Sequence, residues 1–194
     1  MSKEVNEWEN FYQTGSIGWD RGQSSENLNY WLDNDLLKPC RILVPGCGNG
    51  YEVTTLAKLG FDVVAIDIAP SAISNLSTLL NEEKLTAELV LGDFFSWQPE
   101  ESFDAIFEQT SLCALSPDMW AEYEVQLHQW LKPQGKLFAQ FMQTGREGGP
   151  PYHCELTDMH DLFSDKKWLW SEEYISQKKE PGKTESLYVL EKHA

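Results

Sequence analysis

The stretch ILVPGCGNGYE, residues 42–52, decides the fold. A short apolar run leads into glycines at alternate positions, Gly46, Gly48 and Gly50, and a helical pattern follows. Glycine allows the backbone to approach a ligand closely, and a strand that ends in such a turn is shared by several nucleotide-binding folds. A nicotinamide fingerprint would place its third glycine where this chain has Tyr51, so the spacing disfavours a dehydrogenase.

Around this turn, apolar runs of strand length alternate with amphipathic runs of helical spacing, which is typical of an α/β sheet covered on both faces. The predicted strands are 41–44, 63–68, 87–91, 103–107 and 136–141, and the predicted helices are 51–59, 71–80 and 119–131. The runs 168–176 and 186–192, separated by KKEPGK, predict an antiparallel pair at the sheet edge. We therefore expect a Rossmann-like fold, with a mostly parallel seven-stranded sheet, helices on both faces and an antiparallel edge strand.

Length and charge limit the number of domains and the kinds of molecule that the protein can bind. A chain of 194 residues suits a single domain over 1–194, with a helical region at 1–40 in front of the sheet. The 31 acidic residues against 15 Lys and Arg give a net charge of -16, which repels phosphate backbones and anionic membranes. No run approaches the roughly 20 apolar residues that span a bilayer, and the start, MSKEVNEWEN, does not resemble a secretory signal. We expect a cytoplasmic protein that binds neither nucleic acid nor membrane.

The cysteines and histidines predict neither disulfides nor a metal site. Their spacings are irregular and contain no CxxC, HxxxH or HxH pair. Unpaired cysteines usually pack as small buried hydrophobic residues, although redox chemistry at Cys47 or Cys113 is an alternative. The residues concerned are Cys40, Cys47, Cys113, Cys154, His128, His153, His160 and His193.

Acidic residues follow the second and third predicted strands. Asp67 ends VVAID about twenty residues beyond the glycine turn, where a carboxylate accepts hydrogen bonds from ribose hydroxyls. Asp93 and Phe94 in LVLGDFF suit the amine and the ring of an adenine, although a solvated loop aspartate is the alternative for Asp93 alone. The ribose acid is common to NAD and S-adenosylmethionine sites, whereas the G-x-G-x-G spacing is that of methyltransferases. The combination favours S-adenosylmethionine.

Four separated motifs carry a closer resemblance. They are EWENFYQTGSIGWDRGQ (7–23), LVPGCGNGYE (43–52), FEQTSLCALSP (107–117) and GGPPYHCE (148–155), together with an LKPQG turn before the fifth predicted strand. In this order they resemble the thiopurine methyltransferase family, and within it the plant-type halide and thiol methyltransferases. The resemblance covers nearly the whole chain and implies a class I methyltransferase that uses S-adenosylmethionine.

The resemblance also implies roles for individual residues. Residues 1–40 would form a helical lid, with Trp8, Tyr12 and Trp19 folded over the cofactor and Trp19 near the methyl group. A core stripe at helical spacing is the alternative for Trp8 and Tyr12. The full set that we predict to bind the cofactor is Trp8, Tyr12, Trp19, Gly46, Cys47, Gly48, Asp67, Ile68, Asp93, Phe94 and Glu108.

One departure from the family concerns the methyl acceptor. Thiopurine-type members have an arginine beside the substrate at the end of the fourth strand, where this chain has Gln109. An anionic aromatic thiol would lose its charge partner there unless Arg146 supplies one. A rigid lid at GGPPYH is the alternative to a catalytic role for that segment. The catalytic or orienting candidates are Trp19, Glu108, Gln109 and Tyr152, with His153 as a further candidate.

The sequence therefore predicts methyl transfer from S-adenosylmethionine to a small soft nucleophile: a thiol, sulfide, halide or metalloid anion, with thiopurine-type thiols still open. Methylation of a small amine or carboxylate is one alternative, and a non-catalytic module that binds S-adenosylmethionine is another. The oligomeric state is left as a monomer or a homodimer.

Overall fold

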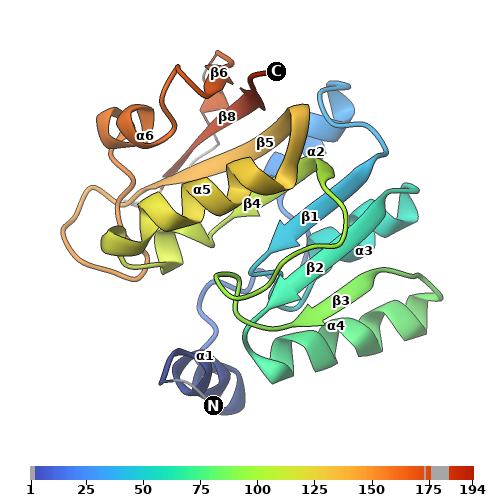
Figure 1. Cartoon of the computed structure of the whole chain (residues 1–194). Helices are drawn as coiled ribbons and strands as arrows, with labels where there is room; N and C mark the ends of the chain where they lie inside the picture. The colour runs from blue at the N-terminus through green and yellow to red at the C-terminus, as the bar shows by residue number, and fades with distance from the viewer. Residues whose placement is uncertain (1–2, 173, 176–183) are drawn as a thin grey trace. The chain divides into compact units, whose positions relative to one another are not determined.

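The computed structural model describes residues 3–172, 174–175 and 184–194. The chain divides into two units, residues 1–98 and 99–194. Figure 1 labels the helices and strands in both. Among the described helices, none combines the length and the apolar character that crossing a membrane requires. The four cysteines are free thiols, and three of them are buried.

The first unit is built on three parallel strands in the order β3-β2-β1. Leu43 lies opposite Val64, which in turn lies opposite Glu88. Leu43 and Val64 are fully buried, because helices and loops cover the central part of these strands. The elements of this unit are α1 (Lys3–Thr14), α2 (Glu26–Asp33), β1 (Arg41–Pro45), α3 (Tyr51–Lys58), β2 (Asp62–Asp67), α4 (Pro70–Glu83) and β3 (Glu88–Leu91).

The helices that join these strands begin where the sequence predicts them. Pro70 occupies the first turn of α4, where its missing N–H costs no intrahelical hydrogen bond. Ala72, Leu76 and Leu80 recur every four residues and form the buried face of α4, which packs on β2 and β3. Gly50 precedes α3 with a φ of 77°.

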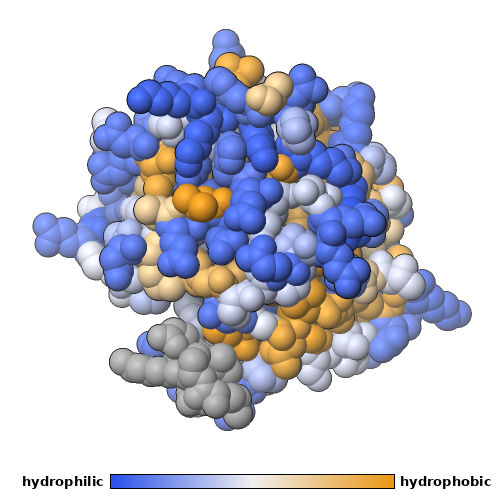
Figure 2. Space-filling model, viewed as in Figure 1, coloured by the Kyte–Doolittle hydropathy of each residue, from blue (hydrophilic) through white to orange (hydrophobic). Residues whose placement is uncertain are grey.

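Most of the face seen in Figure 2 is hydrophilic, but apolar side chains gather over β3 and α4. Leu91, at the end of β3, is 55% exposed. β3 is an outer strand of the first unit, and its length of 4 residues limits the backbone that it offers to another strand.

The second unit joins a parallel pair of strands to antiparallel ones. Phe138 on β5 lies opposite Phe107 on one side and opposite Val189 on the other. β8 runs between β5 and β6, and β7 also pairs with β8. The elements are β4 (Phe103–Gln109), η1 (Leu112–Ala114), η2 (Pro117–Met119), α5 (Trp120–Trp130), β5 (Leu131–Gln143), α6 (Leu156–Leu162), β6 (Trp168–Trp170), β7 (Tyr174–Ile175) and β8 (Thr184–Lys192).

Helix α5 is fixed to the antiparallel strands by buried and partly buried polar contacts. Lys192 Nζ donates to the carbonyls of His128 and Leu131 at 2.8 and 2.7 Å, so it satisfies acceptors at the end of the helix. Glu124 is 2% exposed and accepts from Trp168 Nε1 at 2.7 Å and from Lys167 Nζ at 2.9 Å. These bonds hold the helix against the antiparallel strands.

The predicted strands and helices agree with the structure in kind and order, except that the run predicted at 168–176 contains two short strands, β6 and β7, which both pair with β8. The antiparallel pair is confirmed, because Trp168 lies opposite Lys192. The turn KKEPGK and the predicted strand end at 176 lie outside the described residues. The single domain stays a prediction.

The largest difference in bounds concerns the strand predicted at 136–141, since β5 begins at Leu131. Leu131 lies opposite Phe103, and the register then shifts so that Lys136 lies opposite Ala105. The extra residues form an irregularity of the kind that a bulge introduces, with Gln134 at a φ of 63°. The expected Pro-Gly turn therefore lies within the strand instead of before it.

Gly50 offers a test of how closely the glycine turn packs on α4. A Cβ there would lie 2.3 Å from Leu76 Cδ1, whereas a Cβ at Gly60, with a similar φ of 86°, would meet nothing within 4 Å. We expect Gly50→Ala to lower the free energy of unfolding in urea by about 2 to 4 kcal/mol, and Gly60→Ala by about 1 kcal/mol. Equal losses would contradict the close contact.

Candidate functional site

The ends of the three parallel strands of the first unit bring the predicted cofactor residues to one edge. Pro45 lies opposite Ile66, and Asp67 lies opposite Leu91, so the turns that follow the strands begin at the same level. Backbone bonds join them, since Cys47 N–H donates to the Ile66 carbonyl and Gly92 N–H to the Asp67 carbonyl. The glycine turn, Asp67 and the Asp93 turn are therefore neighbours.

The Asp67 carboxylate is held by two backbone amides. Gly48 N–H donates to Oδ2 at 2.9 Å, and Ala69 N–H donates to Oδ1 at 2.9 Å. Burial raises the pKa of Asp67, and these hydrogen bonds oppose that shift. A carboxylate oxygen has two lone pairs, so each can also accept from a hydroxyl of a ligand. The geometry fits a ribose.

The glycine turn can contact a ligand through its backbone but not through the Cys47 side chain. The Cys47 thiol is buried, and burial, followed by the Asp67 charge, raises its pKa well above the usual value. It is therefore a neutral packing group. Gly48 has a φ of 56°, and a Cβ there would lie 3.3 Å from the Tyr12 hydroxyl. A side chain at this position would crowd the approach of Tyr12.

The aromatic residues predicted for the lid form one cluster. The ring centroid of Trp19 lies 5.4 Å from Trp8, 5.6 Å from Phe11 and 6.1 Å from Tyr12. Phe11 was not among the predicted residues. Burial, followed by the Asp67 charge, raises the pKa of Tyr12, so its hydroxyl stays a donor. Trp19 is 38% exposed, so this cluster is open on one side.

A chain of polar side chains fastens the segment after α1 to the same edge. Asp20 accepts a hydrogen bond from the Asn49 side chain in the glycine turn, and Asn75 Nδ2 on α4 donates to Asn49 Oδ1 at 2.8 Å. Ser25 N–H donates to Glu52 Oε1 at 2.9 Å. The sequence predicted none of these roles, because each joins residues that lie far apart in the chain.

The residues that we predict to bind adenine, Asp93 and Phe94, lie on a turn after β3. Asp93 is exposed, and its Oδ1 accepts from Phe95 N–H at 3.0 Å. Phe94 is half-buried, with its ring centroid 5.7 Å from that of Phe95. Ile68, directly after Asp67, is also half-buried. The turn therefore presents a carboxylate and an aromatic face at the strand end.

In the second unit, Glu108 at the end of β4 is a buried carboxyl group. Its side chain is 2% exposed, and Oε1 accepts from Leu112 N–H at 2.7 Å. Oε2 has no hydrogen-bond partner among the residues that the structure describes. Burial raises the pKa of Glu108 to about 7. Desolvation of a carboxylate is the usual cause of such a shift, and catalytic acids and bases often have one.

Gln109 is linked to a residue that sequence reasoning missed. Its Oε1 accepts from Gln140 Nε2 at 3.1 Å, and the two residues lie opposite each other on β4 and β5. Gln140 is 2% exposed. The signal that could have found it is a polar residue inside the otherwise apolar run LFAQF.

The GGPPYHCE segment is attached to η1 and to the end of β5. Tyr152 N–H donates to the Cys113 carbonyl at 2.7 Å, and Cys154 N–H donates to the Met142 carbonyl at 2.8 Å. His153 Nδ1 accepts from Thr144 N–H at 3.1 Å, and Nε2 lies 3.3 Å from a Glu155 oxygen. Both imidazole nitrogens therefore have a partner nearby in the chain, and a catalytic or orienting role for His153 stays a prediction.

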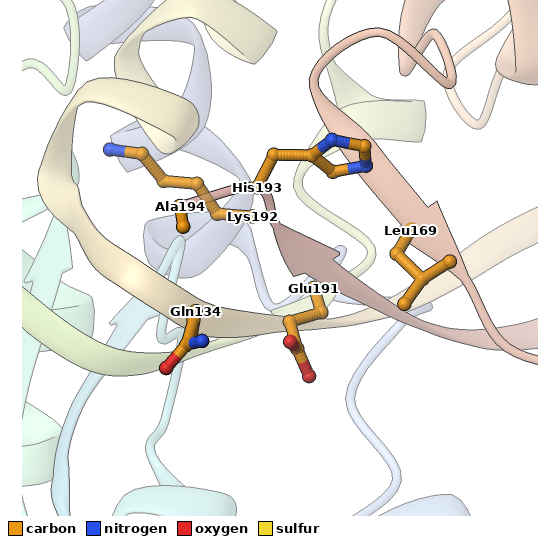
Figure 3. A pocket seen from close by; sticks show the side chains of 6 residues that line it. All are labelled: Gln134, Leu169, Glu191, Lys192, His193 and Ala194. Atoms are coloured by element: carbon orange, nitrogen blue, oxygen red, sulfur yellow. The ribbon is translucent and has the colours of Figure 1, made fainter.

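The hollow in Figure 3 is not lined by any of the candidate site residues of the second unit. Gln134 and Glu191 line it near the start of β5, whereas Gln109 and Gln140 lie further along the strands. Lys192 also lines it but bonds to α5, as described above. The lining residues are Gln134, Leu169, Glu191, Lys192, His193 and Ala194. None of them was predicted for the site.

Residues 3–193 match the family described as thiopurine S-methyltransferase. The chain belongs to this family. Thiocyanate methyltransferase 1 of Brassica oleracea is 32% identical over 159 residues, covering 80% of this chain and 70% of that protein. A probable thiol methyltransferase 2 of Arabidopsis thaliana is 34% identical over 161 residues, with the same coverage of both chains.

The fold is shared with solved methyltransferase structures. The 1,6-didemethyltoxoflavin N1-methyltransferase of Burkholderia thailandensis, solved with S-adenosylhomocysteine, superposes with a TM-score of 0.79 at 16% identity, covering 98% of this chain and 87% of that one. The predictions of a class I fold and of a methyltransferase that uses S-adenosylmethionine are confirmed. The roles of individual site residues stay predictions.

The raised pKa of Glu108 predicts a pH-dependent stability. Because the unfolded carboxyl group titrates near 4.5, the stabilising proton is fully bound below that pH and is lost as pH rises through about 7. We expect Glu108→Gln to unfold like wild type at pH 5 and to gain roughly 1 to 3 kcal/mol relative to it at pH 8, measured by urea titration. Glu122→Gln, exposed on α5, is the control. If the free energy of unfolding changed with pH in the same way for wild type and Glu108→Gln, the raised pKa of Glu108 would be contradicted.

Proposed function

We propose that this protein transfers a methyl group from S-adenosylmethionine to a small soft nucleophile, such as a thiol, sulfide, halide or metalloid anion. The observation that carries the proposal is the Asp67 carboxylate, which two backbone amides hold at a strand end beside the glycine turn. The aromatic cluster of the N-terminal segment lies against the same turn. Family membership and the names of the plant relatives support the choice of acceptor class.

We propose the following roles for the residues that bind the cofactor. Asp67 binds the ribose hydroxyls, Asp93 and Phe94 bind the adenine, and the backbone of Gly46, Cys47 and Gly48 binds the amino-acid end. Ile68 packs beside the ribose, and Glu108 contributes from the end of β4. Residues 1–40 form the lid, with Trp8, Tyr12 and Trp19 over the cofactor. S-adenosylmethionine, when bound, supplies a methyl group that is already activated by the sulfonium charge.

The protein's contribution to catalysis is then alignment, desolvation and the handling of one proton. Glu108 has a pKa of about 7 and exchanges between charged and neutral forms near neutral pH, so it can accept the proton of a thiol. Gln109 and Tyr152 orient the acceptor, and Trp19 lies near the methyl group. Anionic acceptors such as halides need no base, and an apolar pocket strips their hydration.

We also propose that the protein works in the cytoplasm on small molecules and does not bind nucleic acid, as a monomer or a homodimer. The net charge of -16 supports the exclusion of nucleic acid. Four free thiols are in keeping with a reducing compartment.

The ribose assignment is tested by Asp67→Ala. We expect the variant to bind S-adenosylmethionine more weakly by roughly 1 to 3 kcal/mol in calorimetry, because a hydrogen-bonded carboxylate is lost. Asp62→Ala is the control, since this substitution removes the same charge from the exposed start of the same strand. An unchanged dissociation constant for Asp67→Ala would overturn the assignment.

The acceptor class is tested by comparing kcat/KM values at one pH for sulfide, a small thiol, iodide and 6-mercaptopurine. We expect the small acceptors to be preferred, because a neutral amide at Gln109 gives up on the order of 1 kcal/mol relative to a charge-assisted bond. Gln109→Arg should gain relative activity on 6-mercaptopurine. Gln129→Arg, exposed on α5, adds the same charge elsewhere and serves as control.

Three results would count against this proposal. A wild-type preference for 6-mercaptopurine over every small acceptor would show that another group, such as Arg146, supplies the charge. Turnover of an amine or carboxylate in place of the soft nucleophiles would assign a different acceptor. Binding of S-adenosylmethionine without methylation of any acceptor would indicate a non-catalytic module.

A further inference from the structure

The N-terminal helix makes a contact that the proposed cofactor site does not include. Glu9 on α1 accepts a hydrogen bond from Ser71 N–H at 2.9 Å through Oε2, and one from the Ser71 hydroxyl at 2.6 Å through Oε1. Gln13 Nε2 donates to Oε1 at 3.1 Å. The pKa of Glu9 is lowered, chiefly by the Ser71 hydroxyl. Near neutral pH the contact is therefore made by a charged carboxylate.

Helix α4 needs such a partner because its own sequence provides no cap. The N-cap residue, Ala69, has no side-chain acceptor, and Pro70 has no N–H. Ser71 therefore carries the first N–H inside the helix. The N-terminus of a helix bears partial positive charge and stabilises an anion. The Glu9 carboxylate supplies this cap from a helix 62 residues away in the sequence.

The same contact fixes the lid relative to the glycine turn. Glu9 and Tyr12 are three residues apart and face the same side of α1. While Glu9 bonds to Ser71, the Tyr12 hydroxyl lies against Gly48. Asp67 lies between these two contacts, since it accepts from both Gly48 and Ala69. The helix is thus fastened on both sides of the proposed ribose acid.

We propose that Glu9 is a positioning residue for the cofactor. By capping α4, it holds the cluster of Trp8, Tyr12 and Trp19 over the glycine turn, and it acts through these side chains without touching the cofactor itself. This role rests on the proposed function, because it assumes that the cluster covers S-adenosylmethionine.

The first test is Glu9→Ala, compared with Glu7→Ala, which removes the same charge from an exposed position of the same helix. We expect Glu9→Ala to raise the dissociation constant of S-adenosylmethionine about ten-fold in calorimetry, the scale of one lost charge-assisted hydrogen bond. Glu7→Ala should stay within about two-fold of wild type, as for a surface substitution. The KM for S-adenosylmethionine should rise more than the KM for the acceptor.

Ser71→Asp separates positioning from stability. An aspartate in the first turn of α4 gives the helix its own favourable negative charge, while it repels the Glu9 carboxylate. We expect the melting temperature to be kept or raised while S-adenosylmethionine binds about as weakly as to Glu9→Ala. Glu9→Gln keeps an oxygen that can accept from Ser71 N–H, so we expect it to recover part of the lost affinity.

The outcomes separate this inference from the function on which it rests. If wild type binds S-adenosylmethionine and Glu9→Ala binds it equally well, the positioning role is wrong and the proposed function stands. The role is also wrong if Ser71→Asp binds with wild-type affinity. If wild type does not bind S-adenosylmethionine, the proposed function fails, and the positioning role fails with it.

Discussion

The strand edge that we propose as the cofactor site depends on the two hydrogen bonds that hold the Asp67 carboxylate. One comes from the glycine turn after β1 and the other from the start of α4, so a single side chain joins the connections that follow two neighbouring strands. The pair of amides keeps a partly buried charge in place before any ligand arrives. A site prepared in this way does not lose free energy to rearrangement when it binds.

The sequence predicted those features of the fold that depend on local patterns. The glycine turn, Asp67 and Asp93 follow strands whose apolar character is plain, and parallel strands of one sheet end at one edge. The order of the strands and of the helices between them followed from the same periodicity, whereas α6 was not predicted. Strand bounds were less predictable, as β5 shows, because its register against β4 shifts between Phe103 and Ala105.

Contacts between distant residues were not predicted, for a physical reason. Nothing near Glu9 in the sequence indicates that α4 lacks a cap, and nothing near Gln109 indicates that Gln140 will lie opposite it. Such pairs are decided by how the helix and the strands pack. The buried state of Glu108 is similar, since its raised pKa arises from desolvation by residues that fold around the end of β4.

The ring contact between Trp8 and Trp19 gives the protein an intrinsic spectroscopic probe. The ring centroids lie 5.4 Å apart at an interplanar angle of 75°, a geometry that exists while the segment after α1 is folded back on that helix. Coupled aromatic transitions depend steeply on separation and angle, so near-ultraviolet circular dichroism is sensitive to this pair. The folding of the proposed lid can therefore be followed in solution without attaching a dye.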